Sequence, residues 1–119
     1  MTQQGGFMIE CKTSEDAKHV YACAREYLSN QNLEDPDWAE CMELDGQTVG
    51  IDYECGIDWM DFDGLFASMC EYIEDKLPGL MQSGDARYAN LSVGFEYTAE
   101  LTRDGNGIRI TDESSEDEE

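Results

Sequence analysis

Residues 38–55 read WAECMELDGQTVGIDYEC and carry the sequence pattern of a β-hairpin. At its centre is Asp45-Gly46, a dipeptide that suits a type I′ turn because both central residues of that turn need positive φ. Apolar and polar residues largely alternate on both sides of this turn, which is typical of half-buried strands. We therefore predict a β-hairpin formed by residues 38–44 and 47–55.

A two-residue turn at Asp45-Gly46 also predicts the register of this hairpin. Leu44 then faces Gln47, and Met42 faces Val49. Since side chains alternate between the two faces of a strand, most apolar side chains share one face. The opposite face is acidic and carries Glu43, Asp45, Asp52 and Glu54.

Amphipathic helices are predicted on both sides of the hairpin. Residues 13–29 begin with the helix-start signal Thr13-Ser14 and then place apolar residues at i, i+3, i+4 and i+7. Residues 58–77 carry a second apolar stripe, which ends at Pro78-Gly79. We expect both helices to bury these stripes against the same sheet.

Alternating residues predict three further strands. Residues 7–12 form the first, and residues 91–101 show the clearest alternation in the chain. A short last strand around residues 108–111 follows the turn sequence of residues 104–107. Residues 80–89 contain Ser-Gly-Asp and are predicted to be a loop.

The resulting order, βαββαββ, predicts an α+β fold. Two helices pack on one face of an antiparallel sheet, in a variant of the ferredoxin-like plan. Residues 1–111 are expected to form this single domain. Residues 112–119 contain six acids and no apolar group, so we expect a disordered acidic tail.

The charge of the chain is its main functional signal. There are 28 acidic and 7 basic residues, a formal net charge of -21. From Glu26 to Asp75 there are fifteen Asp and Glu and no Lys, Arg or His. Charge this far from zero destabilises a compact state through self-repulsion, so a basic partner, a bound cation or adaptation to high salt should compensate it.

Catalysis is not indicated by the sequence. A nucleophile needs a nearby base and an orienting group, and His19 is the only histidine. The chain also contains no Gly-rich phosphate loop and no CxxC motif. We therefore predict that the protein is not an enzyme and uses no cofactor.

Calcium binding and adaptation to high salt account for the charge less well than a basic partner does. Residues 102–113 match part of a calcium-loop pattern, but Thr102 stands where the first acidic ligand belongs, and two strands rather than two helices flank the segment. We predict no metal site. Five Cys and six Met are not features that adaptation to high salt requires.

The cysteines and the N-terminal residues indicate the cellular compartment of the protein. Five cysteines are odd in number and scattered, which favours buried thiols in a reducing cytoplasm over a disulfide framework. Residues 1–6 are polar, and no apolar run is long enough to cross a bilayer. We expect a cytoplasmic protein.

Folded strands and helices would hold the carboxylates as a fixed array. Same-face residues of a strand lie about 6.7 Å apart, and neighbours on a helix surface about 5–6 Å apart. DNA also presents closely spaced negative charges to its binding proteins. The residues that we expect to bind a partner in this way are Glu34, Asp35, Asp37, Glu43, Asp45, Asp52, Glu54, Asp58, Trp59, Asp61, Asp63, Glu71, Glu74 and Asp75.

In size, charge, acidic segment 34–75 and acidic end 116–119, the chain resembles the small DNA-mimic inhibitors of bacteria and their phages. These include antirestriction proteins, anti-CRISPR proteins and mimics that bind histone-like proteins. The resemblance implies a protein that does not bind nucleic acid directly. Instead it blocks the basic nucleic-acid-binding surface of a CRISPR effector, a restriction enzyme or a histone-like protein in the bacterial host cell.

An anti-CRISPR protein is the most concrete form of this hypothesis. Two alternatives stay open. The first is an immunity protein that neutralises a basic nuclease toxin, because such proteins also combine acidic patches with aromatic anchors. The second is a structural or assembly protein of a phage.

Overall fold

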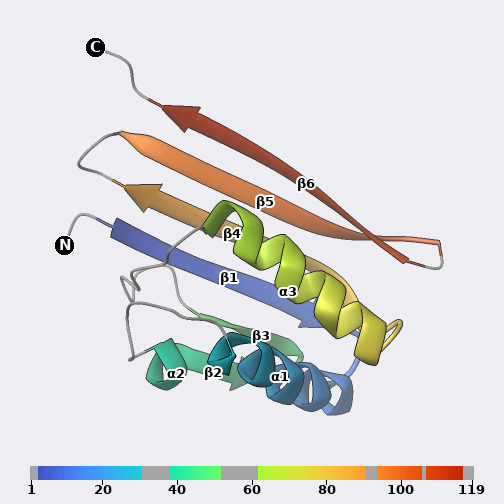
Figure 1. Ribbon diagram of the computed structural model, residues 1–119. Coiled ribbons are helices and arrows are strands. Elements are labelled where there is room, and N and C mark those ends of the chain that lie inside the picture. The colour runs from blue at the N-terminus through green and yellow to red at the C-terminus, as the bar shows by residue number, and fades with distance from the viewer. Residues whose placement is uncertain (1–2, 31–37, 52–61, 91–93, 106, 117–119) are drawn as a thin grey trace.

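The computed structural model describes residues 3–30, 38–51, 62–90, 94–105 and 107–116 (Figure 1). It has the predicted α+β class, with helices on an antiparallel sheet. Its elements are β1 (Gln3–Cys11), α1 (Ser14–Ser29), α2 (Trp38–Cys41), β2 (Met42–Asp45), β3 (Thr48–Ile51), α3 (Phe62–Lys76), β4 (Met81–Asn90), β5 (Phe95–Asp104) and β6 (Gly107–Glu116).

The six strands form one antiparallel sheet in the order β2-β3-β1-β4-β5-β6. Figure 1 shows α1 and α3 on the same side of this sheet, α1 over the β2–β3–β1 part and α3 over the β1–β4 part. Within the described part of the chain, no helix or strand covers the other side. We call that side the open face.

The hydrophobic core lies between the helices and the sheet. Phe7 of β1 packs on Phe66 of α3, with ring centroids 6.1 Å apart. The core-facing residues alternate along the strands and recur every three or four positions along the helices. Residues with these two spacings therefore meet in one core. Its fully buried members include Ile9, Val20, Leu28, Val49, Ile51, Phe66, Met69, Ile73 and Leu101.

Helix α1 begins as the sequence predicts. Thr13 is extended and its hydroxyl oxygen accepts a hydrogen bond from the backbone N–H of Asp16, at 3.0 Å. This satisfies one of the backbone donors that the first helical turn leaves without a partner. Glu15 and Asp16 add negative charge where the helix dipole favours it.

The hairpin forms, but its turn and register differ from the prediction. Asp45 pairs with Thr48, so the two turn residues are Gly46 and Gln47, and Gly46 supplies the positive φ of +63°. Met42 now pairs with Ile51. This change of register leaves the same side chains on each face of the hairpin. Each residue's partner changes by two positions, and side chains alternate with a period of two.

The first part of the predicted strand 38–44 is helical. Trp38–Cys41 forms the short helix α2, and β2 begins only at Met42. The order βαββαββ is therefore wrong in detail, and the sheet has six strands instead of five. The change shortens the edge strand β2 to four residues.

The predicted loop of residues 80–89 is wrong as well. Most of this segment is β4, which lies in the middle of the sheet between β1 and β5. Gly84 marks a close approach of two strands and not a turn, because a Cβ there would lie 2.8 Å from the backbone oxygen of Met8. Ser-Gly-Asp is therefore a misleading turn signal in this chain.

The acidic tail predicted for residues 112–119 is also corrected. Strand β6 continues to Glu116, and its residues 112–116 pair with residues 95–99 of β5. The Tyr97 hydroxyl hydrogen-bonds the Asp112 carboxylate at 3.1 Å. Residues 117–119 lie outside the described part of the chain.

A chain that ends at Thr111 is therefore expected to be destabilised. It loses five β5–β6 residue pairs and the Tyr97–Asp112 contact, so at a net energy of about 0.5 kcal/mol per hydrogen bond or more the loss is at least about 3 kcal/mol. Urea unfolding measures the loss. A chain that ends at Glu116 keeps every described pair and is the control. Equal midpoints for the two chains would show that the end of β6 contributes nothing.

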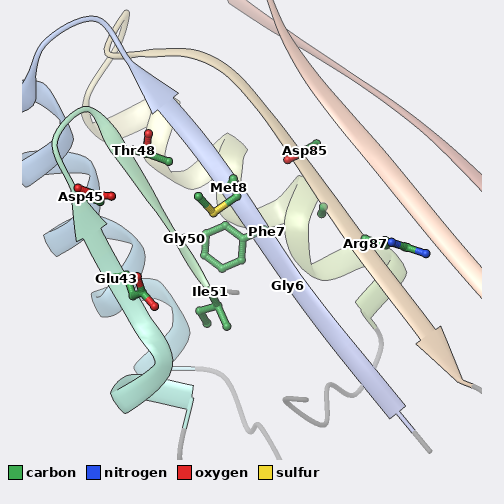
Figure 2. A pocket seen from close by; sticks show the side chains of 11 residues that line it. Gly6, Phe7, Met8, Glu43, Asp45, Thr48, Gly50, Ile51, Asp85 and Arg87 are labelled. Carbon is green, nitrogen blue, oxygen red and sulfur yellow. The ribbon is translucent and has the colours of Figure 1, made fainter. Parts of the chain in front are cut away.

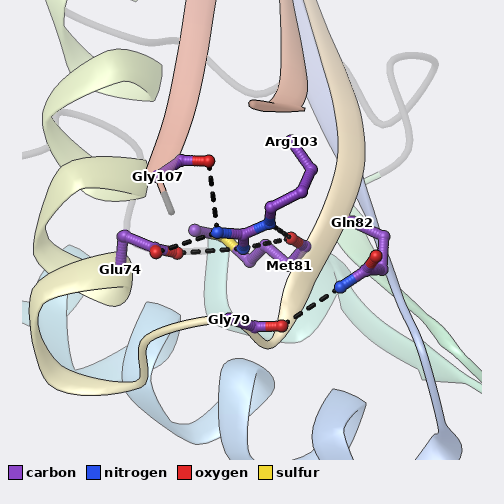
Figure 3. A network of polar contacts seen from close by, with 6 residues as sticks. All are labelled: Glu74, Gly79, Met81, Gln82, Arg103 and Gly107. Carbon is purple, nitrogen blue, oxygen red and sulfur yellow. Dashed lines mark hydrogen bonds and ion pairs between the residues drawn. The ribbon is translucent and has the colours of Figure 1, made fainter. Parts of the chain in front are cut away.

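Arg103 of β5 connects α3 to the strands β4 and β6 through hydrogen bonds (Figure 3). Its guanidinium donates to both carboxylate oxygens of Glu74 at 2.9 and 3.0 Å, and to the carbonyl oxygens of Met81 and Gly107. Both charged side chains are largely shielded, with exposed fractions of 19% for Arg103 and 16% for Glu74. A bidentate pair of this kind fixes geometry as well as charge.

Candidate functional site

The open face of the sheet is strongly acidic. Odd-numbered residues of β1 and β5 enter the core, so the even-numbered residues point to the open face. Its described basic side chains are Arg87 and Arg109, and the latter lies 3.6 Å from the Asp104 carboxylate. The eight exposed carboxylates on this face are Glu10, Glu43, Asp45, Asp85, Glu96, Glu100, Asp104 and Glu113.

Cross-strand pairing places many of these residues in rows that run across the sheet. One row joins Glu43 of β2 through Gly50 and Met8 to Asp85 of β4 and Glu100 of β5. Adjacent strands are about 4.8 Å apart, so this row spans about 19 Å from β2 to β5. The rigid sheet thus fixes the spacing of its carboxylates.

A hollow of about 440 Å³ lies on the open face between β2 and β4 (Figure 2). Gly6 and Gly50 contribute no side chains to it, and the Met8 side chain lies inside it. Glu43 and Asp45 stand on one side of it, and Asp85 stands on the other. The hollow is therefore an acidic groove in the part of the open face that borders the edge strand β2.

Met8 supplies an apolar surface inside this hollow. The residue is 45% exposed, which is unusual for a large apolar residue. The sulfur lies over Gly50, where an added Cβ would come within 2.7 Å of it and within 2.0 Å of the Phe7 backbone oxygen. Glycine at position 50 is therefore required for β1 and β3 to approach this closely.

The predicted binding residues do not share one surface. Glu43 and Asp45 lie on the open face, as the hairpin pattern predicts. Glu71 and Asp75 are exposed on α3, on the helix side of the sheet. The remaining ones, whose side chains lie outside the described residues, are Glu34, Asp35, Asp37, Asp52, Glu54, Asp58, Trp59, Asp61 and Asp63.

Glu74 has a structural role instead. Its carboxylate is held by Arg103, so it is not part of an exposed array. On the helix side the described acids are also balanced better, because four bases accompany seven acids. The bases are Lys18, Arg25, Lys76 and Arg103, and the acids are Glu15, Asp16, Glu26, Glu71, Glu74, Asp75 and Asp112. The open face, with eight acids and two bases, has the larger excess of negative charge.

Several acids of the open face were absent from the predicted set. Glu96 and Glu100 could have been found, because the alternation of residues 91–101 already places them opposite the apolar residues. Asp85 gave no such signal, since its segment resembles a loop in sequence. Its position depends on the pairing of β4 with both β1 and β5.

Asp85 and Glu100 lie directly opposite each other on adjacent strands. Like charges in this position destabilise a sheet by about 0.2–1 kcal/mol. Glu100→Gln is therefore expected to stabilise the protein by about 0.5 kcal/mol, measured as the urea midpoint. Glu96→Gln is the matched control, because Glu96 faces Ala89. An equal shift for both variants would mean that only net charge matters.

The buried cysteines are poor nucleophiles. Burial, with smaller contributions from the Asp16 and Glu10 carboxylates, raises the pKa of the Cys11 thiol to about 11. Burial also raises the pKa of Cys23 and, more strongly, that of Cys70. These thiols stay protonated at neutral pH, and a protonated thiol reacts slowly.

These raised pKa values predict a loss of stability in alkali. Below pH 9 the thiols are protonated in both states, and above pH 9 the unfolded chain releases its protons first. The free energy of unfolding should therefore fall as pH rises from about 9 to about 11. Cys11→Ala combined with Cys70→Ala should make this dependence shallower. An unchanged slope would contradict the assignment.

Metal and membrane sites are not evident in the described residues. They contain no group of three or more His, Cys, Asp or Glu placed to hold one metal ion. None of the described helices is long and apolar enough to span a membrane. Comparison with protein-family models, curated proteins and solved structures finds no match to this chain.

Proposed function

We propose that this protein is a DNA-mimic inhibitor that occupies the basic nucleic-acid-binding surface of a host defence protein. The observation that supports this proposal is the open face, where eight carboxylates and two guanidinium groups are fixed on one sheet. A basic groove that binds phosphates through Lys and Arg can bind such a face instead. Association of this kind is accelerated by charge.

The most specific form of the proposal is an anti-CRISPR protein acting in the cytoplasm of a bacterial host. A restriction enzyme or a histone-like protein has the same surface chemistry and would be blocked in the same way. The inhibitor performs no reaction, needs no cofactor and does not bind nucleic acid itself. For its scaffold, we propose a ferredoxin-like arrangement of β1–β4 that β5 and β6 extend.

A sheet suits this role for a physical reason. Its rows of carboxylates have a fixed spacing, so the partner does not have to order them on binding. Preorganisation lowers the entropic cost of association. The directly opposed pair Asp85 and Glu100 also gains most when a cation is placed between them.

Affinity capture from a bacterial host, with mass spectrometry of the bound proteins, tests the proposal. The bait is the full chain, and the control bait carries Glu43→Lys, Asp85→Lys and Glu100→Lys. Basic nucleic-acid-binding proteins of defence systems, retained by the first bait and lost with the second, would support it. Retention of a nuclease toxin alone would favour an immunity protein, and retention of phage structural proteins would favour an assembly role.

A further inference from the structure

We propose that the hollow between β2 and β4 receives an arginine-bearing segment of the protein partner. This inference rests on the proposed function and identifies where on the open face the partner's contact is strongest. The guanidinium would lie over the Met8 side chain, between the Glu43–Asp45 side and the Asp85 side of the hollow. The remaining acids of the face would then serve mainly to attract the partner.

Charge and shape together favour a cation at this place. Three carboxylates and one guanidinium, that of Arg87, line the hollow. Figure 2 shows the Arg87 side chain directed away from Met8, so its charge lies at the outer side of β4. The hollow of about 440 Å³ is within the range of about 300–1,000 Å³ that is typical of ligand pockets.

Arginine fits this hollow better than lysine does. A guanidinium is flat, is weakly hydrated and binds a carboxylate through two parallel hydrogen bonds. The exposed Met8 residue, whose sulfur covers Gly50, offers it an apolar surface on which to lie. A lysine ammonium is compact and strongly hydrated, so it gains less from an apolar floor.

The inference also agrees with how proteins bind DNA. Arginine side chains enter narrow, strongly negative grooves between two lines of phosphates. Here Glu43 and Asp45 of β2 flank one side, and Asp85, the single carboxylate of β4, flanks the other, with the strands β3 and β1 between them. A mimic that copies this feature competes for the arginine itself.

Two basic peptides of equal length, oligo-arginine and oligo-lysine, test the inference by titration at low ionic strength. The full chain is expected to bind oligo-arginine about fivefold more tightly than oligo-lysine. Glu43→Gln with Asp45→Asn removes the charge on one side of the hollow. This variant is expected to weaken oligo-arginine binding at least about tenfold and to abolish the preference for arginine.

Glu96→Gln with Glu113→Gln is the matched control, since it removes two charges from the same face outside the hollow. It should weaken both peptides equally, by about threefold, through the loss of general attraction. Equal effects of the two variants, or no preference for arginine in the parent, would overturn the arginine site while leaving the acidic interface in place. If neither peptide binds the parent chain, the proposed function fails as well.

Discussion

Changing Glu43, Asp85 and Glu100 together to lysine is expected to weaken binding to the basic partner by more than about 100-fold. These residues lie in one row across the open face, and each reversal replaces an attraction by a repulsion. All three are exposed, so the fold should survive. Titration calorimetry with the partner identified by affinity capture measures the effect, and circular dichroism checks the fold.

The control for this variant makes the same change of net charge on the opposite side. Glu15, Glu71 and Asp75 are exposed on α1 and α3, and none of them lies on the open face. Reversing these three should reduce affinity only slightly, through weaker long-range attraction. If both triple variants lose affinity equally, net charge and not the open face explains binding.

Arg103→Leu is expected to destabilise the fold by about 3 kcal/mol, because it leaves the shielded Glu74 carboxylate without its bidentate partner. The carbonyl oxygens of Met81 and Gly107 lose a donor at the same time. Thermal and urea unfolding measure the change. Arg103→Lys should recover only part of it, since an ammonium cannot donate two parallel hydrogen bonds.

Arg109→Leu is the matched control for this prediction. Arg109 also faces a carboxylate, that of Asp104, but both side chains are more than 60% exposed. Exposed pairs contribute about 0–1 kcal/mol, so this variant should change stability little. Adding Glu74→Gln to Arg103→Leu should restore some stability, because the unpaired charge is then removed. Equal losses for Arg103→Leu and Arg109→Leu would contradict the role assigned to Arg103.

Periodicity predicted the elements whose apolar pattern is clear. The apolar residues of the α1 and α3 stripes are buried in the core, and so are the alternating apolar residues around Ile9 and Val49. Strand β4 could not be predicted in this way, because its core-facing Gly84 and Ala86 are small. It is held in the centre of the sheet by its two neighbours, and such pairing is long-range information that a local pattern does not contain.

The charge of the chain predicts an acidic surface, and the hairpin pattern places Glu43 and Asp45 on it. The other residues of the open face could not all be chosen from the sequence. Sequence distance then misled the choice of residues, because the acidic segment that ends at Asp75 contributes to both sides of the sheet. Asp85 and Glu43 lie in the same row only because the order of the strands places β4 on the same sheet as β2, and local sequence does not show this order.

A competition experiment at two ionic strengths tests whether this protein replaces DNA on its basic partner. Labelled duplex DNA is bound to the purified basic partner, and this protein is added at about 0.05 M and about 0.15 M salt, where the Debye length is roughly 14 Å and 8 Å. We expect the protein to displace DNA at both concentrations, and to do so less effectively at the higher one. Simultaneous binding of DNA and this protein, with no mutual weakening at either salt concentration, would show that the protein is not a DNA mimic.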